Sequence, residues 1–505
     1  MEKILVWIDD PVSFGIAKAV NDHYEYELFA IFDVANIRKK FFSQQKFVSF
    51  KKIWFYRDHV CPISKKPNLE YLKNFERQYG INLWQLVYSE RVFYKYNDYY
   101  KFTQDEILAI LESECKFLEK LLDEIKPDYL FMRTTDIHRT QLLSDLCKSK
   151  GIRVLMLSPT RFGYRFSISS ELDKFDNNDA KNIPYVKRNL KELQKFVEKF
   201  NSSEQGKLFY QSKKRMSLSQ RIVRYIKLLS IMSDNDYKKF YDNFGRTRFK
   251  FMIKRFPGKN WLNIKRRESF LNNNSIINLN NNDHFVYFPL HIEPERTLSV
   301  AAPFYTNQLE IITHISKSLP VGYKLYVKEH PVQKVRGWRT IDFYKKILEL
   351  PNVNLVHPSI KSEEMLKNCS LVITITGTTG IEAAFYEKPS IVFTDVSYSS
   401  LPFVHRLKNI EELPTIIGKF LEEKFDYSSL NDYVNFIENK SFEVNLTKIY
   451  TDIKNYFDFA TIYGNAEDIS SENMKSFLIN HESEFKKIAE EHIKKINEYK
   501  NFSEN

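Results

Sequence analysis

The chain has 505 residues, of which 43% are hydrophobic and 28% are charged, a balance typical of a soluble globular protein. This length exceeds what one hydrophobic core usually holds, so we expect two or three domains. Aromatic residues make up 15% of the chain and only 13 residues are glycine, which excludes collagen-like and glycine-linker architectures. No apolar run is long enough to cross a bilayer, and the first residues lack the apolar region of a signal peptide.

The net charge of +12 comes from one segment. Between Lys207 and Glu268 there are 18 Lys and Arg residues against four Asp and Glu, so the rest of the chain is close to neutral. A localised basic patch indicates an anionic partner: lipid headgroups, a phosphate-bearing substrate or nucleic acid.

The first part of the chain reads as strands alternating with helices. Short apolar runs predict strands at Ile4–Ile8, Lys52–Phe55, Tyr129–Met132 and Val154–Leu157. A capping box of Thr103 and Glu106 opens a helix with a core-facing stripe, and a second helix over 142–150 ends at Gly151. Strand, helix and strand in this order favour a parallel sheet.

The middle of the chain shows no strand pattern from about Val186 to Asn274. Residues 189–200 are predicted to be helical, and Arg221, Arg224 and Lys227 lie three apart among apolar residues, as in a basic amphipathic helix. Such a helix either packs on the domain body with its charges in water, or forms an inserted element that docks on a membrane surface or an acceptor.

A second α/β unit follows an asparagine-rich linker at 272–282. Its predicted strands are Phe285–Phe288, Lys324–Lys328, Val353–Val356, Leu371–Thr376 and Ser390–Thr394, and its predicted helices are Asn307–Ser318, Thr340–Leu350, Ser362–Asn368 and the segment from Gly377 to Tyr386. We therefore expect an α/β protein of the two-domain B type of glycosyltransferase (GT-B), with two Rossmann-like domains facing a cleft. Other two-lobed α/β proteins share this outline. The predicted parts are an N-terminal acceptor domain over 1–185, a basic helical insert and linker over 186–282, a C-terminal nucleotide-sugar-binding domain over 283–428, and a helical tail over 429–505.

The strongest local motif follows the fourth strand of the second unit. A run of β-branched residues leads into Thr376, Gly377, Thr378 and Thr379, and a helix begins there. Glycine lets the backbone turn tightly, while hydroxyls and exposed N–H groups at a helix start can hold a phosphate. Glu382, on the first turn, could accept hydrogen bonds from a ribose. The alternative is an ordinary strand-to-helix turn with threonine caps.

Two more motifs end strands of the same unit. His330 and Pro331 follow the second strand, where open α/β sheets bind ligands, and the proline holds the histidine extended. An imidazole there could donate to the phosphate of a leaving group, although a lone His-Pro pair is a weak signal. His291 and Glu293 lie in the loop after the first strand, which is otherwise explained as a charged surface loop.

Residues 285–402 resemble the capsule polysaccharide biosynthesis proteins of bacteria. The motifs that carry the resemblance are PLHIEPERT, LYVKEHP and ITGTTGIEAAFYEKPSIVF, in that order. That family includes glycosyltransferases that use CMP-activated sugars, notably Kdo transferases, and it is distantly similar to bacterial sialyltransferases. The resemblance implies that His330 and Pro331 contact the donor phosphate, with Thr378 and Thr379 as the hydroxyl pair. Many Kdo transferases have glutamine where this chain has His291.

The resemblance also implies the acceptor half of the site. Residues 83–93 and 126–166 look like the acceptor domain of such proteins, which would supply a base for the acceptor hydroxyl, while helix dipoles and side chains would replace a metal. The candidate bases are Asp136 and His138, followed by Glu90 and the Asp9-Asp10 pair. Arg133, Arg161 and Arg165 could meet an anionic acceptor. Asp234-Asn235-Asp236 lies in the insert and is not interpreted as a metal site.

The sequence thus predicts a metal-independent glycosyltransferase without a cofactor, for which a nucleotide-sugar is a substrate. It would extend a surface or capsular polysaccharide or its lipid-linked acceptor. Two alternatives stay open: a teichoic-acid-type transferase that uses a CDP-alditol, and a non-catalytic polysaccharide assembly protein. Four widely spaced cysteines favour the cytoplasm, and residues 207–268 predict attachment to an anionic inner membrane surface. No nucleic-acid module accompanies the basic segment, so we do not expect a nucleic-acid partner.

Overall fold

The computed structural model describes most of the chain. The described residues are 1–60, 66–94, 99–176, 184–199, 219, 222, 223, 226, 229, 240–255, 259–280, 282–457 and 469–503. The predicted features that lie outside them are Asp234-Asn235-Asp236, Arg221, Arg224, Lys227 and residues 207–218.

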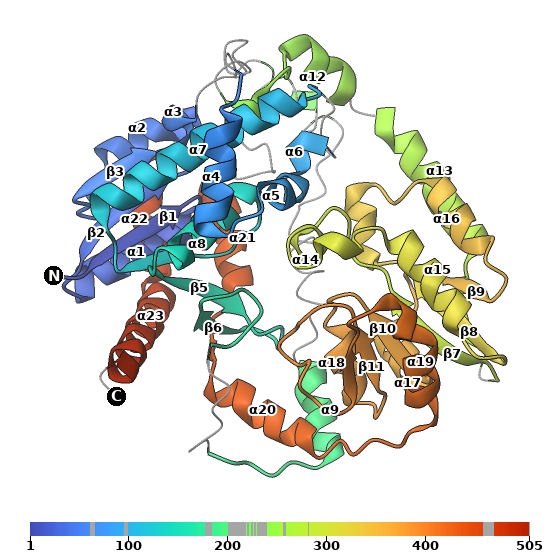
Figure 1. Ribbon diagram of the computed structural model, residues 1–505. Helices are drawn as coiled ribbons and strands as arrows, with labels where there is room; N and C mark the ends of the chain where they lie inside the picture. Colours follow the sequence, from blue (N-terminus) through green and yellow to red (C-terminus); the bar gives the residue numbers. More distant parts are fainter. Residues whose placement is uncertain are drawn as a thin grey trace.

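The first domain is built on a mainly parallel sheet (Figure 1). Its strands are β1 (Lys3–Ile8), β2 (Glu27–Phe32), β3 (Lys52–Phe55), β4 (Tyr129–Met132), β5 (Arg153–Pro159), β6 (Arg165–Ser169) and β13 (Phe442–Glu443). They are ordered β13-β6-β5-β4-β1-β2-β3, with β6 and β13 antiparallel to their neighbours. Ile4 pairs with Leu28 on one side and with Tyr129 on the other. The order in which strands are added to the sheet reverses between β1 and β4. Open α/β sheets bind ligands at such a switch point.

Helices cover both faces of this sheet. They are α1 (Pro11–His23), α2 (Asn36–Gln44), α3 (Tyr56–His59), α4 (Leu69–Tyr79), α5 (Leu83–Ser89), α6 (Arg91–Tyr94), α7 (Gln104–Ile125) and α8 (His138–Ser149). α1 and α2 pack on one face, and α4, α5, α7 and α8 on the other. The predicted capping box of α7 is present, because the Thr103 hydroxyl accepts from the Glu106 N–H and the Glu106 carboxylate accepts from the Thr103 N–H.

The second domain contains a fully parallel sheet. Its strands are β7 (His284–Pro289), β8 (Tyr323–Lys328), β9 (Val353–Val356), β10 (Leu371–Thr374), β11 (Ser390–Val392) and β12 (Val404–Arg406). Their order is β12-β11-β10-β7-β8-β9, so the switch point lies between β7 and β10. Phe285 and Tyr287 face one side and Val286 and Phe288 the other, as the alternation of a strand requires.

The helices of the second domain alternate with its strands. They are α14 (Arg296–Ser299), α15 (Gln308–Ser318), α16 (Ile341–Leu348), α17 (Ser362–Asn368), α18 (Thr379–Ala384) and α19 (Leu413–Glu422), with 3-10 turns η3 (Pro303–Tyr305), η4 (Pro331–Arg336) and η5 (Ile410–Glu412). α15 and α19 pack on one face of the sheet, and α17 and α18 on the other. Two Rossmann-like sheets with helices on both faces confirm the predicted fold class.

The insert and the tail connect the two domains. The insert contains α9 (Leu190–Lys199), the 3-10 turn η2 (Tyr241–Asn243), α12 (Arg248–Arg255) and α13 (Lys259–Asn274), and the tail contains α20 (Ser429–Asn439), α21 (Leu446–Phe457), α22 (Ser471–Asn480) and α23 (Glu482–Ser503). After α20 the chain returns to the first domain, where β13 joins the sheet and α21 to α23 join the core on the face of α1. The tail after α20 is therefore part of the first domain's core, whereas α20 packs with α18 and β11 of the second domain.

The structure contains no helix, within its described part, that is long and apolar enough to cross a membrane.

The contact between α1 and α23 depends on a glycine. A Cβ atom at Gly15 would lie 2.5 Å from Cε2 of Phe485, whose ring is 2% exposed and cannot move aside. We expect Gly15→Ala to lower the free energy of unfolding by about 1–3 kcal/mol, the usual cost of overpacking a core. Urea unfolding followed by circular dichroism measures this loss.

The matched control is Gly418→Ala in α19. No atom lies within 4 Å of the added Cβ there, so the helix should gain up to about 1 kcal/mol from the better helix former. Equal effects of the two substitutions would contradict the packing argument.

Candidate active site

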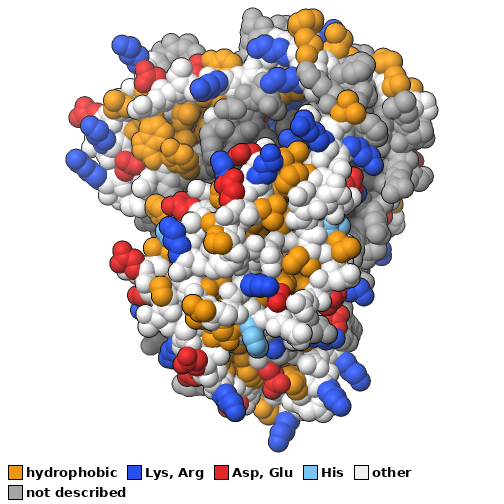
Figure 2. All heavy atoms as spheres, turned by 90° about the vertical axis from the view of Figure 1, so that its right-hand side faces the viewer, with side chains coloured by type: hydrophobic (Ala, Val, Ile, Leu, Met, Phe, Trp, Pro, Cys, Tyr) orange, Lys and Arg blue, Asp and Glu red, His pale blue; other side chains and the backbone are white. Residues whose placement is uncertain are grey.

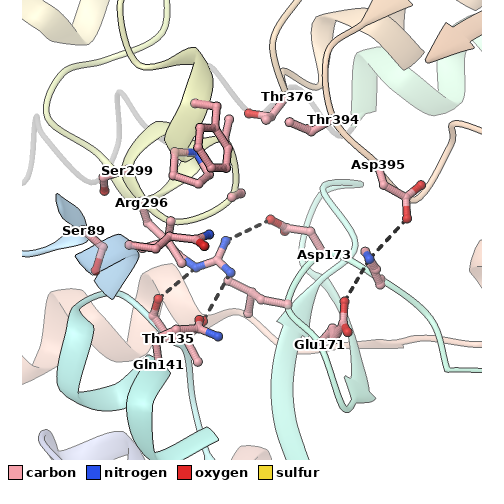
Figure 3. A pocket seen from close by; sticks show the side chains of 18 of the residues that line it. Ser89, Thr135, Gln141, Glu171, Asp173, Arg296, Ser299, Thr376, Thr394 and Asp395 are labelled. Carbon is pink, nitrogen blue, oxygen red and sulfur yellow. Dashed lines mark hydrogen bonds and ion pairs between the residues drawn. The ribbon is translucent and has the colours of Figure 1, made fainter. Parts of the chain in front are cut away.

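A cavity of about 1070 Å³ separates the two sheets at their carboxyl ends. Both domains contribute side chains to its wall (Figure 3). The first domain supplies Thr135, Arg161 and Asp173, and the second supplies Arg296, Thr376 and Asp395. The predicted cleft between two facing domains is therefore present.

Two arginines cross this cleft and share one carboxylate. Arg296 donates to the carbonyl oxygen of Thr135 at 3.2 Å and approaches Asp173 Oδ2 at 3.4 Å. Arg161 binds Asp173 at 2.7 Å and donates to the carbonyl oxygen of Thr376 in the other domain. Burial raises the pKa of Asp173, but the two guanidinium groups outweigh it and hold that pKa below its usual value. The carboxylate stays ionised and links the domains.

A second ionic contact crosses the cleft nearby. Lys174 lies 2.9 Å from Glu171 in its own domain and 3.2 Å from Asp395 in the other (Figure 3). Its side chain is partly exposed, so this contact contributes less than the buried pair at Asp173.

The turn after β10 is held tightly against the sheet. The Thr374 hydroxyl accepts from the Gly377 N–H at 3.1 Å, and the Tyr398 hydroxyl donates to the Gly377 carbonyl. A Cβ at Gly377 would lie 2.6 Å from the Thr374 hydroxyl oxygen and 3.4 Å from the His291 ring. Only glycine fits this close approach, which explains its place in the motif.

His291 lies under this turn. Its Nε2 atom is 3.2 Å from the Thr374 hydroxyl oxygen and 3.5 Å from the Thr376 nitrogen. Burial, together with Arg161, His330 and Arg339, lowers the pKa of His291 to about 3. The ring is therefore neutral and supports the backbone of the turn.

His330 follows β8 and caps the 3-10 turn η4. Its Nδ1 atom accepts from the Val332 N–H at 3.2 Å, and Pro331 occupies the first position of the turn. Burial, with the positive charges of Lys328 and Arg339, lowers the pKa of His330 to about 4. With Nδ1 as an acceptor, the proton of the neutral ring lies on Nε2. That N–H makes no hydrogen bond to any described residue, so it is available to a ligand.

A buried ionic cluster fixes the His330 loop. Glu329 is fully buried and accepts from the His330 N–H at 2.7 Å, from Arg339 Nε at 2.9 Å and from the Tyr344 hydroxyl at 2.7 Å. Arg339 also lies 3.2 Å from Glu293, a predicted donor-binding residue. The sequence analysis did not identify Arg339, because nothing in its local pattern marks it.

The remaining predicted donor residues lie in the turn after β10 or in the helix α18 that follows it. Thr376 lines the cavity, and its hydroxyl donates to the Thr297 carbonyl at 3.3 Å. Thr378 precedes α18 and Thr379 begins it; both are partly exposed, and neither hydroxyl has a hydrogen-bond partner within the described chain. Glu382 lies one turn into α18 and is partly exposed.

Two carboxylates lie at the switch point of the first sheet. Asp136 follows β4, is partly exposed, and adds to the electrostatic environment of Glu295 and Arg296 across the cleft. Asp9 follows β1, and burial, Asp10 and Asp136 raise its pKa to about 7 against the effect of Arg133. A carboxylate with such a pKa can take up a proton near neutral pH.

Glu90 and His138 lie deep in the first domain. His138 is fully buried, with Nδ1 2.7 Å from Glu90 and Nε2 2.8 Å from Glu114. The Tyr56 and Tyr241 hydroxyls also donate to Glu114, at 2.6 and 3.1 Å. Neither Glu90 nor His138 is among the residues that line the cavity, and their contacts connect α5, α7, α8 and η2. Sequence spacing could not reveal this burial. Other predicted site residues that follow strands at the two sheet edges are also outside the cavity lining: Asp9, Asp136, His330, Thr378 and Thr379.

The three predicted acceptor arginines lie in three different environments. Arg161 lines the cavity. Arg133 stacks over the Tyr450 ring at 5.3 Å and contacts Asp10 at 3.2 Å. Arg165 of β6 donates to the hydroxyl and to the carbonyl oxygen of Ser441, and these bonds hold the tail beside the strand. Arg296, the arginine of the PLHIEPERT motif in the loop expected to face the cleft, lines the cavity with Arg161. Within the described chain, no group of three or more His, Cys, Asp and Glu side chains could hold a metal ion.

Comparisons with known proteins agree with the predicted resemblance. Residues 212–402 match the family described as "Capsule polysaccharide biosynthesis protein". This match confirms the resemblance noted for residues 285–402 and includes part of the insert. None of the curated proteins matches the chain.

Solved structures align with the chain at low identity and low TM-score. UDP-GlcNAc 2-epimerase from Methanocaldococcus jannaschii is 13% identical over 87% of this chain and 100% of that chain, with a TM-score of 0.24. KpsC from Thermosulfurimonas dismutans, a beta Kdo 2,7 transferase, is 11% identical over 80% of this chain and 97% of that chain, with a TM-score of 0.31.

The buried His138 cluster should make stability depend on pH. Burial lowers the pKa of His138, but Glu114 and Glu90 outweigh it and raise that pKa from 6.5 to about 9. Because the folded-state pKa is the higher one, this stabilisation is complete below pH 6.5 and is lost as the pH rises through about 9. In Glu114→Gln the loss over this range should be smaller, and stability at neutral pH should fall by about 3–5 kcal/mol.

Urea unfolding of the wild type and Glu114→Gln across this pH range measures the effect. The control is Asp342→Asn, whose side chain is 72% exposed and should leave the pH profile unchanged. Parallel profiles for the wild type and Glu114→Gln would show that His138 is not charged in the folded protein.

Proposed function

We propose that this chain, whose residues 212–402 match the capsule polysaccharide biosynthesis proteins, is a glycosyltransferase that transfers a sugar from a nucleotide-activated donor. The acceptor is a growing capsular polysaccharide or its lipid-linked precursor. One observation supports this proposal above all: His330, whose Nε2–H has no partner within the described chain, and the turn after β10 both follow strands of one parallel sheet at its carboxyl edge. Asp136, which follows β4 of the other sheet, acts electrostatically on Arg296 across the cleft.

The donor phosphate binds at the second sheet. His330 donates its Nε2 proton to a phosphate oxygen, and the hydroxyls of Thr378 and Thr379 donate from the neighbouring turn. Because the imidazole is neutral and fixed before the ligand arrives, it stabilises charge on the departing phosphate with little reorganisation. Glu382, in the first turn of α18, accepts hydrogen bonds from the ribose.

The acceptor hydroxyl is activated at the first sheet. Asp136 takes the proton while the acceptor oxygen bonds to the anomeric carbon of the sugar and the bond to the nucleotide phosphate breaks. Asp9, with a pKa of about 7, is the second carboxylate that could relay this proton. Arg161 and Arg296 place positive charge beside an anionic acceptor, and Glu90 and His138 hold the helices beneath.

Nucleotide preference tests the proposal. A ligand that binds only the folded state raises the melting temperature by mass action, so CMP, CDP, UDP and GDP should shift it to different extents. We expect one nucleotide, CMP by the resemblance, to give the largest shift. A CDP-specific shift with phosphorus retained in the product would indicate the polyol-phosphate transferase instead. Binding without turnover of any nucleotide-sugar would indicate an assembly protein.

Removing the His330 ring should slow transfer. His330→Ala is expected to lower kcat by about 10²–10³-fold, as loss of one preorganised donor does, and to reduce the thermal shift by the nucleotide. The control is His314→Ala on α15. The His314 side chain is 37% exposed, and its contact with Glu310 is long, at 3.9 Å. A folded His330→Ala protein with unchanged kcat would exclude His330 from the mechanism.

A further inference from the structure

Helix α12 turns an apolar face outward. Phe249, Met252 and Ile253 are spaced three and four residues apart and so share one face of the helix. Their exposed fractions are 66%, 42% and 45%, whereas Phe251 on the opposite side is 5% exposed. A helix of a globular protein normally buries such a face.

The same outward pattern occurs before and after α12. Leu262, near the start of α13, is 67% exposed. Ile222, Val223 and Ile226 are helical, fall at the same kind of spacing, and are between 43% and 66% exposed. Single exposed apolar side chains need no explanation, but a run of them in one region of the chain marks an interaction site.

Basic side chains surround this apolar face. Residues 240–274 contain nine Lys and Arg against two acidic residues, Asp242 and Glu268. Glu268 lies close to Lys334, and Asp242 to Arg139, so the acids are already paired. Figure 2 shows hydrophobic and basic side chains interspersed along the upper part of the face that it views. Among the described side chains of this segment, the exposed basic residues are Arg248, Lys250, Lys254, Lys265 and Arg266. Lys250 donates to the Tyr99 carbonyl at 3.3 Å and Lys265 lies 3.9 Å from Glu268, so both make contacts with the protein while remaining exposed.

The segment before α12 and the helix α13 are each bonded to one of the two domains. Tyr241, just before α12, bonds to Arg139 at 2.8 Å and to Glu114 at 3.1 Å in the buried cluster of the first domain. Arg267 of α13 donates to the carbonyl oxygen of Gly337 in the second domain at 3.0 Å. The apolar face is thus presented on a fixed support.

We propose that the outward face of α12, together with Leu262, inserts into an anionic lipid bilayer while the surrounding Lys and Arg bind the headgroups. Acyl chains match the apolar side chains and anionic headgroups match the charge. Nucleic acid would satisfy the charges but leave the apolar side chains in water. A second copy would bring two positive surfaces together, which repel each other. This surface goes beyond the proposed catalysis and does not depend on it.

Vesicle sedimentation with the full chain tests the proposal, without donor or acceptor. The wild type should bind vesicles of equimolar phosphatidylglycerol and phosphatidylcholine at low salt, and bind phosphatidylcholine alone far more weakly. Phe249→Ser with Ile253→Ser keeps every charge and should weaken binding by about tenfold or more. Ile479→Ser on α22, which removes an apolar side chain of similar exposure (59%), should bind as the wild type does.

Insertion is read directly from Phe249→Trp. Its fluorescence should be quenched by brominated acyl chains more strongly than that of the wild type. All variants should melt at the wild-type temperature, because the replaced side chains are exposed. Equal vesicle binding by the wild type and the double serine variant would overturn the proposal. So would a dimer that the double serine variant dissociates, or binding of single-stranded DNA in place of vesicles.

Discussion

The geometry of the cleft depends on one carboxylate that two domains share. Asp173 holds Arg161 of the first domain and Arg296 of the second, and each arginine continues to a backbone carbonyl across the cleft. The two carbonyls belong to Thr376, after β10, and Thr135, after β4. The loops at the two switch points are therefore held face to face. Because these charges are largely removed from water, their attraction is weakly screened and fixes the approach of the domains more firmly than the exposed Lys174 contacts do.

Within the second domain, chemistry depends on backbone that is fixed before a ligand arrives. His291 and Thr374 support the glycine turn from below, and Glu329 with Arg339 fixes the loop that carries His330. Both histidines are neutral because burial and nearby positive charges lower their pKa values. The edge therefore offers N–H and O–H donors in set positions, which suits a phosphate whose charge grows as its bond to a sugar breaks.

The first domain has carboxylates at the carboxyl edge of its sheet and a buried ionic cluster in its interior. Asp9 and Asp136 lie at the sheet edge, while the His138 cluster lies beneath and connects α5, α7, α8 and the start of the insert. The same cluster holds Tyr241 of η2, which precedes α12 in the insert. The insert that carries the proposed membrane contact is therefore attached to the domain that carries the proposed base. The tail adds to this arrangement, since α21 to α23 complete the core on the opposite face of the sheet.

The sequence by itself determined the local elements and the parts of the donor edge. Periodicity and capping predicted β3, β4, β9 and α17 with their observed bounds, and the strand-glycine-helix pattern identified the turn at Gly377. These features depend on neighbours in the chain, so a local pattern records them. It missed β2, β6, β12 and β13, and it did not identify Arg339 or Asp173. Only the tertiary structure buried His138 between two glutamates, joined Arg165 to the tail and paired Arg296 with Asp173. These pairs join residues that are between 24 and 276 positions apart in the sequence. They depend on how helices and sheets pack in three dimensions, which no local spacing along the chain encodes.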